Sequence, residues 1–384
     1  MGALSNIRIV DLTRLLPGPF GTTVLADLGA EVVKVESPLE DDWARSLSGF
    51  FASINRGKKS VSLNLKKLAG KEIFFRLVES AEAVAEQFRP GVMDKLGVGF
   101  EPCRKHNPKI VYASLSGYGA DGPYADKAGH DLNYLSLAGI EGVTGAEDGE
   151  LAIPGVQVAD QVGGLYLAIA ILAGLNQART RGEAVKIDVS IFESALSLLG
   201  PHLSEFFRTQ RQPGPAGMEL NGLLPNYHLY QTRDGRWLSL AALEGKFWAN
   251  FCKAVARPDW ELRLLGDGQE HKKLKKEIAE LFASRPLKEW EELMARAPDL
   301  CLEPVRKFSE IENDPQIQAR ETLVELEGKP GTRFRVVRSP VRMAGAEKDR
   351  PGPAPKRGAD TESILKELGY SGEDISRFRQ EGVI

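Results

Sequence analysis

The first 120 residues alternate between short apolar runs and stretches in which apolar residues recur at helical spacing. The apolar runs IRIVDL, EVVKVES, SVSLNL, AVAEQF and KIVYASLSGYG predict strands at 7–12, 31–37, 60–65, 83–88 and 109–119. Within 67–81, the spacing of Ile73, Phe74, Leu77 and Val78 predicts a helix. Strands that alternate with helices predict a parallel sheet wound in βαβ units.

The pattern changes after Gly119. The apolar run LYLAIAILAGL at 165–175 predicts a buried helix, because a membrane span takes roughly 20 apolar residues. A strand that runs into a helix is expected at 185–199, and two strands at 227–243 joined by Asp234-Gly235. Helices are expected within 245–297, an extended surface segment at 328–357, and a last short helix, DTESILKELG, at the end of the chain.

These elements predict an α/β protein with two domains. We expect a large Rossmann-like parallel-sheet domain at 1–205, completed by a C-terminal return segment at 322–384. A linker rich in Gly and Pro at 206–222 would lead to a smaller α+β domain at 223–321.

Composition narrows the function classes. The formal net charge of −3 gives no reason to expect a nucleic-acid or membrane partner. Three widely spaced cysteines form neither a metal motif nor a disulfide framework, so we expect no metal site and a reducing, cytoplasmic location. The N-terminus lacks the pattern of a signal peptide.

The first turn does not suit a dinucleotide. A GxGxxG turn would bring backbone N–H groups close to a pyrophosphate, but the chain has LLPGPFG instead. Pro17 and Pro19 remove two of the donors that such a loop needs. NAD binding is therefore not supported.

Three residues could carry chemistry. His130 is either a loop residue or a general base, and Asp131 after it would cap the helix that follows. Asp160 immediately precedes the long apolar helix, beside the flexible pair Gly163-Gly164. It is either an N-cap or an acid or nucleophile next to N–H groups that could bind an oxyanion. Glu244 either favours a helix dipole or orients a histidine.

The motifs together carry a resemblance. The order LLPGPF, LADLGAEVVKVE, NRGKKSVSLNLK, FRPGVMDKLGVG, VYASLSGYGADGP, AGHDLNYLSLAG and VADQVGG resembles the family III CoA-transferase superfamily of the CaiB/BaiF type, over nearly the whole chain. Within that superfamily, GHDLNYL is most similar to the α-methylacyl-CoA racemase branch.

The racemase resemblance implies an acyl-CoA 2-epimerase. His130 and Asp160 would stand on opposite faces of the thioester α-carbon, one removing the proton and the other returning it, with Glu244 as partner of the histidine. The transferase branch instead implies that Asp160 is a nucleophile that moves CoA to a carboxylic acid through an aspartyl-CoA thioester. His130 and Glu244 favour the racemase, and Leu16 stands where the oxalate-using branch has a glutamine.

Two further alternatives stay open: a non-catalytic subunit of a hetero-oligomeric transferase, and a dehydratase with no CoA transfer step.

The resemblance also implies a CoA site and an assembly. CoA would be a substrate, with no permanently bound cofactor, and its phosphates would meet basic side chains. The expected CoA-binding residues are Arg56, Leu63, Asn64, Leu65, Lys66, Arg89, Lys95, Gly129, Asp131 and Tyr134. Ser37 replaces an arginine that racemases usually have, which puts one phosphate contact in doubt. Two chains would interlock as a homodimer.

Overall fold

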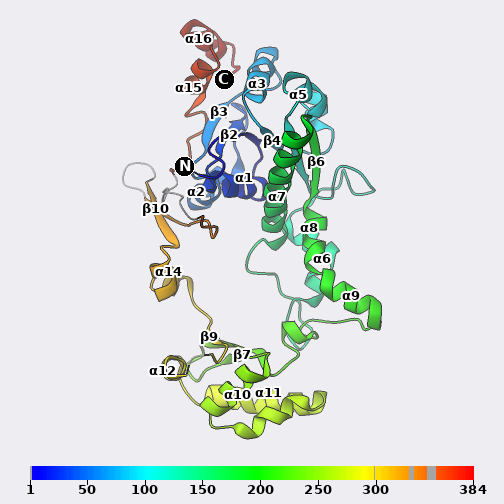
Figure 1. The fold of residues 1–384 in the computed structure, drawn as a ribbon, viewed down its shortest axis with the longest axis vertical. Helices are drawn as coiled ribbons and strands as arrows, with labels where there is room; N and C mark the ends of the chain where they lie inside the picture. The colour runs from blue at the N-terminus through cyan, green and yellow to red at the C-terminus, as the bar shows by residue number, and fades with distance from the viewer. Residues whose placement is uncertain (1, 298, 328–332, 344–351) are drawn as a thin grey trace. The chain divides into compact units, whose positions relative to one another are not determined.

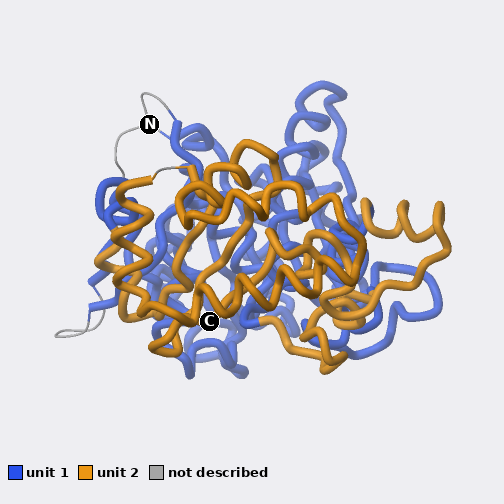
Figure 2. The backbone as a smooth tube through the Cα atoms, turned by 90° about the horizontal axis from the view of Figure 1, so that it is seen from below, with its two compact units in different colours: residues 1–138, 155–200, 315–384 blue, residues 139–154, 201–314 orange. Residues whose placement is uncertain are grey.

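The computed structural model describes residues 2–297, 299–327, 333–343 and 352–384 (Figure 1). The described residues form two compact units (Figure 2). Unit 1 comprises 1–138, 155–200 and 315–384, and unit 2 comprises 139–154 and 201–314. The domain limits expected from the sequence stay a prediction.

Unit 1 is built on a six-stranded parallel sheet with the order β3-β2-β1-β4-β5-β6. This order reverses direction between β1 and β4, as in doubly wound α/β folds. The fold class expected from the sequence is confirmed. The strands are β1 (Arg8–Leu12), β2 (Glu31–Glu36), β3 (Lys59–Ser62), β4 (Ala83–Glu86), β5 (Val111–Ser116) and β6 (Val185–Ser190).

Helices connect the strands and cover both faces of the sheet. One face of the sheet packs against helices within residues 68–106 and against the two C-terminal helices. Their shared core includes Val33, Phe74 and Phe378. The helices of unit 1 are α1 (Pro17–Asp27), α2 (Ser48–Asn55), α3 (Leu68–Glu79), α4 (Val92–Leu96), α5 (Phe100–His106), α6 (Asp131–Ala138), α7 (Val158–Arg181), α8 (Ile191–Leu198), α14 (Pro315–Ala319), α15 (Thr361–Glu367), α16 (Gly372–Gln380) and the 3-10 helix η1 (Trp43–Ser46).

The long helix α7 packs against α1, β5 and β6, and Figure 1 shows it in green beside β6. Gly163 and Gly164 were expected to be flexible, but both lie inside the helix. A Cβ on Gly164 would lie 2.3 Å from the Pro17 carbonyl oxygen, and one on Gly21 would lie 2.3 Å from that of Gly164. These glycines therefore allow α1 and α7 to approach closely.

Among the described residues, α7 is the one helix long and apolar enough to cross a membrane, judged by length and composition only. Core helices of soluble proteins meet the same criteria, and the inner side of α7 is buried in unit 1. Its outer side exposes Leu165, Tyr166, Ile169 and Leu172.

Unit 2 joins a three-stranded antiparallel sheet to helices around an aromatic core that includes Trp248, Trp260 and Trp290. The expected hairpin at 227–243 is present, with Asp234-Gly235 in its turn. Its elements are β7 (Tyr227–Gln231), β8 (Trp237–Ala241), β9 (Leu302–Pro304), α9 (Gly200–Thr209), α10 (Gly245–Ala254), α11 (Gly268–Ala283), α12 (Leu287–Arg296), α13 (Phe308–Ile311) and the 3-10 helices η2 (Glu141–Val143), η3 (Glu219–Asn221) and η4 (Pro258–Leu265).

The segment expected to be extended at 328–357 contains an extended strand, β11 (Arg333–Val337), which pairs antiparallel with β10 (Leu323–Glu327); positions 328–332 and 344–351 lie outside the described residues. One expectation for the C-terminal region was wrong. The helix at 361–367 is not the last, because α16 follows it. A capping box between Ser371 and Asp374 begins α16.

Candidate active site

Two of the cavities in unit 1 lie where the loops after β1, β2 and β4 meet. The carboxyl ends of parallel strands share one edge of a sheet, and ligands bind there at the point where the strand order reverses. We call them cavity A and cavity B.

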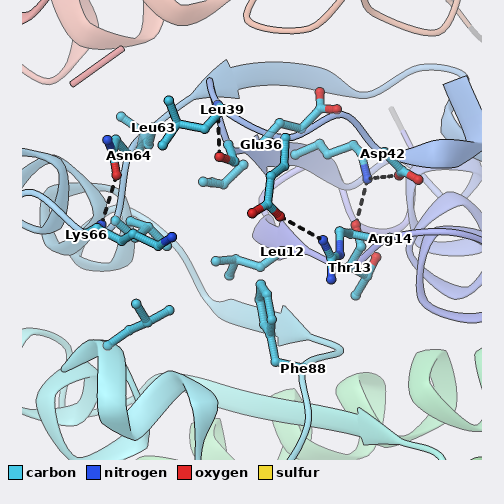
Figure 3. A pocket seen from close by; sticks show the side chains of 16 residues that line it. Leu12, Thr13, Arg14, Glu36, Leu39, Asp42, Leu63, Asn64, Lys66 and Phe88 are labelled. Atoms are coloured by element: carbon cyan, nitrogen blue, oxygen red, sulfur yellow. Dashed lines mark hydrogen bonds and ion pairs between the residues drawn. The ribbon is translucent and has the colours of Figure 1, made fainter. Parts of the chain in front are cut away.

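Cavity A has a volume of about 140 Å³, with apolar walls and a charged rim. Figure 3 shows Lys66 and Arg14 on opposite sides of the view and Phe88 below them. The lining residues are Leu12, Thr13, Arg14, Lys34, Val35, Glu36, Ser37, Leu39, Glu40, Asp42, Leu63, Asn64, Leu65, Lys66, Phe88 and Leu96.

Four of the residues expected to bind CoA line cavity A, namely 63–66. The Asn64 side-chain oxygen accepts a hydrogen bond of 3.1 Å from the Lys66 backbone N–H, which fixes the turn after β3. Ser37 also lines the cavity, and its hydroxyl accepts a bond of 3.1 Å from the Leu39 N–H. Residues 63–66 and Ser37 therefore form part of the wall of cavity A.

Sequence reasoning missed several residues of this cavity. Arg14 follows β1 and its guanidinium lies 5.4 Å from the centre of the Phe88 ring, which follows β4. Their position in the sequence could have indicated them, because they follow the two strands between which the strand order reverses, where ligands bind in such sheets.

Cavity B, of about 380 Å³, contains both expected catalytic residues of unit 1, His130 and Asp160. It adjoins cavity A, because neighbouring residues of three segments line the two, such as Asp42 and Trp43. The residues lining cavity B are Leu15, Leu16, Pro17, Trp43, Ala44, Leu47, Phe50, Gln87, Gly129, His130, Tyr134, Gln157, Asp160 and Ile191.

The loop between the cavities is held by a buried ion pair. Lys34 lies 3.3 Å from Asp42 and donates a hydrogen bond of 2.7 Å to the Thr13 carbonyl oxygen. Asp42 accepts bonds from the backbone N–H groups of Leu15 (3.2 Å) and Ala44 (3.1 Å). Leu15 has a φ of 62°, so these bonds help to keep a non-glycine residue in the left-handed region.

Asp160 is the third residue of α7 and does not cap it, contrary to the N-cap reading. Asp131 was expected to cap its own helix, but its carboxylate accepts a hydrogen bond of 3.0 Å from the Asp160 N–H and another from Ala159. Those two N–H groups are therefore engaged and do not serve as the expected oxyanion donors. The carboxylate of Asp131 instead holds the start of α7 beside the start of α6.

The Asp160 carboxyl group is partly buried, and this burial, together with the nearby Asp131 carboxylate, raises its pKa to about 7. Desolvation disfavours the charged form, and a second negative charge disfavours it further. A carboxyl group with this pKa can both accept and release a proton near neutral pH.

His130 is exposed at the start of α6. Its backbone N–H donates to the Asn133 side chain over 3.1 Å, and its carbonyl accepts from the Asn133 N–H over 2.8 Å. Gly129 and Tyr134 complete this side of cavity B, joined by a bond of 2.7 Å from the tyrosine hydroxyl to the glycine carbonyl. This network fixes the GHD loop.

The other expected CoA contacts lie elsewhere. Arg56 lines neither cavity, and its guanidinium is paired with Asp27. Arg89 and Lys95 are exposed and line neither cavity A nor cavity B, although their chain neighbours Phe88 and Leu96 line cavity A. Arg89 lines a further cavity of about 170 Å³ that also includes Phe88.

Glu244 belongs to unit 2, where it is exposed and directly precedes α10. Its carboxylate makes no capping hydrogen bond to that helix. Its proposed partnership with His130 therefore stays a prediction.

Comparisons with known proteins identify the family. The model of CoA-transferase family III matches residues 4–361. The chain is 31% identical to the succinyl-CoA:glutarate CoA-transferase of Mus musculus, over all of this chain and 91% of that protein. It is 32% identical to the α-methylacyl-CoA racemase of Homo sapiens, over all of this chain and 97% of that protein.

A solved structure agrees with these matches. A CAIB/BAIF family protein from Brucella suis superposes with a TM-score of 0.82 at 26% identity, over 96% of this chain and 99% of that one. Family III proteins act on CoA thioesters, and the relatives named above are a CoA-transferase and a racemase. The chain belongs to CoA-transferase family III and is an enzyme of that family.

Proposed function

We propose that this enzyme is an acyl-CoA 2-epimerase that inverts the α-carbon of a CoA thioester by 1,1-proton transfer. The observation that carries the proposal is that His130 and Asp160 line the same cavity. Inversion needs one proton-transferring group on each face of the α-carbon. The His130 imidazole and the Asp160 carboxyl group, whose pKa is raised to about 7, can supply these two groups.

In the proposed reaction, one group removes the α-proton and leaves an enolate, and the other delivers a proton to the opposite face. In one direction the Asp160 carboxylate is the base and protonated His130 the acid; in the other they exchange roles. Partial burial of Asp160 supports this, because it raises the pKa of this carboxyl group to about 7, where the group can act as acid or base near neutral pH.

Cavity A is the proposed site for the nucleotide part of CoA. Its apolar walls suit a flat base, and Lys66 and Arg14 at its rim suit phosphate groups. Since cavity B adjoins it, the pantetheine arm would cross the loop at 13–17 and present the thioester to His130 and Asp160.

The second candidate is CoA transfer with Asp160 as nucleophile. A carboxylate oxygen would attack the thioester carbonyl, the CoA thiolate would leave, and a mixed anhydride would form. The thiolate would then attack the aspartyl carbonyl, which releases the first acid and leaves an aspartyl-CoA thioester. The carboxylate of the acceptor acid would attack this thioester and displace the thiolate, forming a second anhydride. Attack of the thiolate on the acceptor's carbonyl would give the new acyl-CoA and free Asp160. The transferase names among the relatives favour this candidate.

We also propose that two chains interlock as a homodimer, with Glu244 of one chain beside His130 of the other. The exposed apolar side of α7 supports an interface of this kind.

The test of the proposed function is exchange of the α-proton for deuterium without any CoA acceptor. His130→Ala should abolish exchange, and Asp160→Ala should abolish both exchange and CoA transfer. If His130→Ala leaves the main activity intact and that activity is CoA transfer, the second candidate is correct.

A further inference from the structure

The wall of cavity B opposite the GHD loop is apolar and partly exposed. Trp43 lies in η1, Phe50 lies in α2, and Leu47 is the residue between these two helices; they are spaced four and three residues apart, and all three line the cavity. Trp43 is 66% exposed and Leu47 46%, which is unusual for side chains of this size. Leu15 and Leu16 extend the same wall.

Among the described residues of one chain, the lining of cavity B includes no lysine and no arginine. Its titratable groups are His130, Asp160 and the Tyr134 phenol. An acyl group that ends in a second carboxylate would therefore lose its water without gaining a cation, and it would enter a cavity that already contains Asp160.

Of the cations nearest in sequence to this wall, Arg45 and Lys34 are engaged by acids, and Arg14 lines cavity A instead. Arg45 forms an ion pair of 2.6 Å with Glu36, and its guanidinium lies over the Phe51 ring. Lys34 is buried against Asp42. Arg14 lies within 3.8 Å of Glu40, on the side of cavity A.

We propose that cavity B is the acyl subsite and that Trp43, Leu47 and Phe50 determine its specificity. They select an apolar acyl group over one with a second carboxylate. This inference rests on the proposed function, since it takes the reacting thioester to lie between His130 and Asp160. The occupant follows from the position of cavity B beside cavity A, from its apolar wall and from the lack of cationic side chains among the described residues that line it.

The test compares three ligands by isothermal titration calorimetry on the full-length protein: CoA, hexanoyl-CoA and adipoyl-CoA. The two thioesters have acyl chains of equal length and differ in the terminal group, a methyl against a carboxylate. Each buried methylene gives roughly fourfold in affinity, so hexanoyl-CoA should bind at least about tenfold more tightly than CoA. Adipoyl-CoA should bind at least about tenfold more weakly than hexanoyl-CoA.

Variants locate the selectivity. Leu47→Ala should weaken hexanoyl-CoA binding by about tenfold and leave CoA binding unchanged. Leu47→Arg should reverse the preference in favour of adipoyl-CoA. Leu68→Ala is the matched control, because Leu68 is an exposed leucine of unit 1 that lines neither cavity. Unchanged affinity for CoA also shows that each variant is folded.

Trp43 provides a direct readout, since it is the one tryptophan in the sequence before residue 237. Hexanoyl-CoA should change the tryptophan emission more than CoA does, and Trp43→Phe should remove that difference.

Equal affinity for the three ligands, tighter binding of adipoyl-CoA, or binding of none of them would overturn the inference. Failure of the proposed function is separate, because binding needs no turnover. If hexanoyl-CoA binds more tightly than adipoyl-CoA but no α-proton exchange occurs, the inferred acyl subsite stands and the proposed epimerase activity is wrong.

Discussion

At the scale of single residues, Asp160 shows how position determines chemistry. An aspartate in water is fully ionised at neutral pH, but partial burial and the neighbouring Asp131 carboxylate raise the pKa of this one to about 7. The group therefore reaches the range useful for proton transfer, and the folded state has to accommodate a disfavoured charge.

This predicts a pH dependence of stability. A carboxyl group whose pKa is higher in the folded than in the unfolded state stabilises the fold fully below pH 4, and this contribution is lost as the pH rises through 7. Asp160→Asn removes the disfavoured charge, so the variant should be about 1–2 kcal/mol more stable than the wild type at pH 8. At pH 5 the difference should be much smaller.

Urea unfolding of both proteins at pH 5 and pH 8 measures this difference. Asp121→Asn is the control, since Asp121 is an exposed loop residue of the same unit. A difference between wild type and Asp160→Asn that does not change with pH would contradict the assigned role of burial.

His130 and Asp160 could be predicted from the sequence as candidate site residues, because their motifs are local, whereas the partners of several cations could not be predicted. Arg56 was expected to bind CoA, but its guanidinium is paired with Asp27. Lys58 belongs to the same basic run, RGKK. In the structure it is fully buried and bonds to Asp11 over 3.0 Å, and burial lowers its pKa to about 8. Its partner is 47 residues away, and no local pattern shows that these residues meet.

At the scale of elements, the start of α7 depends on a residue of α6. Asp131 was expected to cap its own helix, α6, but its carboxylate accepts a hydrogen bond from the Asp160 N–H of α7, 29 residues away. Capping patterns in sequence report contacts within a few residues. The strands of the sheet were predictable for the same reason, because each is a contiguous apolar run.

The two functions of Asp131 can be separated by substitution. Asp131→Asn keeps a side-chain oxygen for the Asp160 N–H but removes the charge, so the pKa of Asp160 should fall. Asp131→Ala should lower this pKa as well and also destabilise the protein by about 1 kcal/mol through loss of the cap.

The pH profile of the α-proton exchange rate and a urea titration measure these two effects. The limb assigned to Asp160 should move to lower pH in both variants. An unmoved limb in Asp131→Asn would mean that the Asp131 charge does not act on Asp160.

At the scale of the whole molecule, the described structure has two units, and the proposed interlocked dimer would explain an otherwise unusual surface. The outer side of α7 presents Leu165, Ile169 and Leu172 at a helical spacing of four and three residues. The sequence showed the apolar helix but not which side is unburied, because apolar residues occur all round it.

Ile169→Glu should therefore disrupt the dimer, since Ile169 is 57% exposed and a charge there would be buried in an interface. Sedimentation velocity should show a dimer for the wild type and monomers for the variant. Leu262→Glu, at a leucine of unit 2 that is 77% exposed, is the control. A wild-type monomer at micromolar concentration would contradict the proposed assembly.

The central claim is that His130 and Asp160 transfer protons at the α-carbon of a CoA thioester. The most direct test incubates the wild-type enzyme with an enantiopure 2-methylacyl-CoA in D₂O, without acceptor acid, and follows the α-position by proton NMR and the configuration by chiral chromatography. We predict loss of the α-proton signal together with inversion, both absent in His130→Ala. An unexchanged α-proton, together with CoA transfer once an acceptor acid is added, would contradict the account and leave Asp160 as a nucleophile.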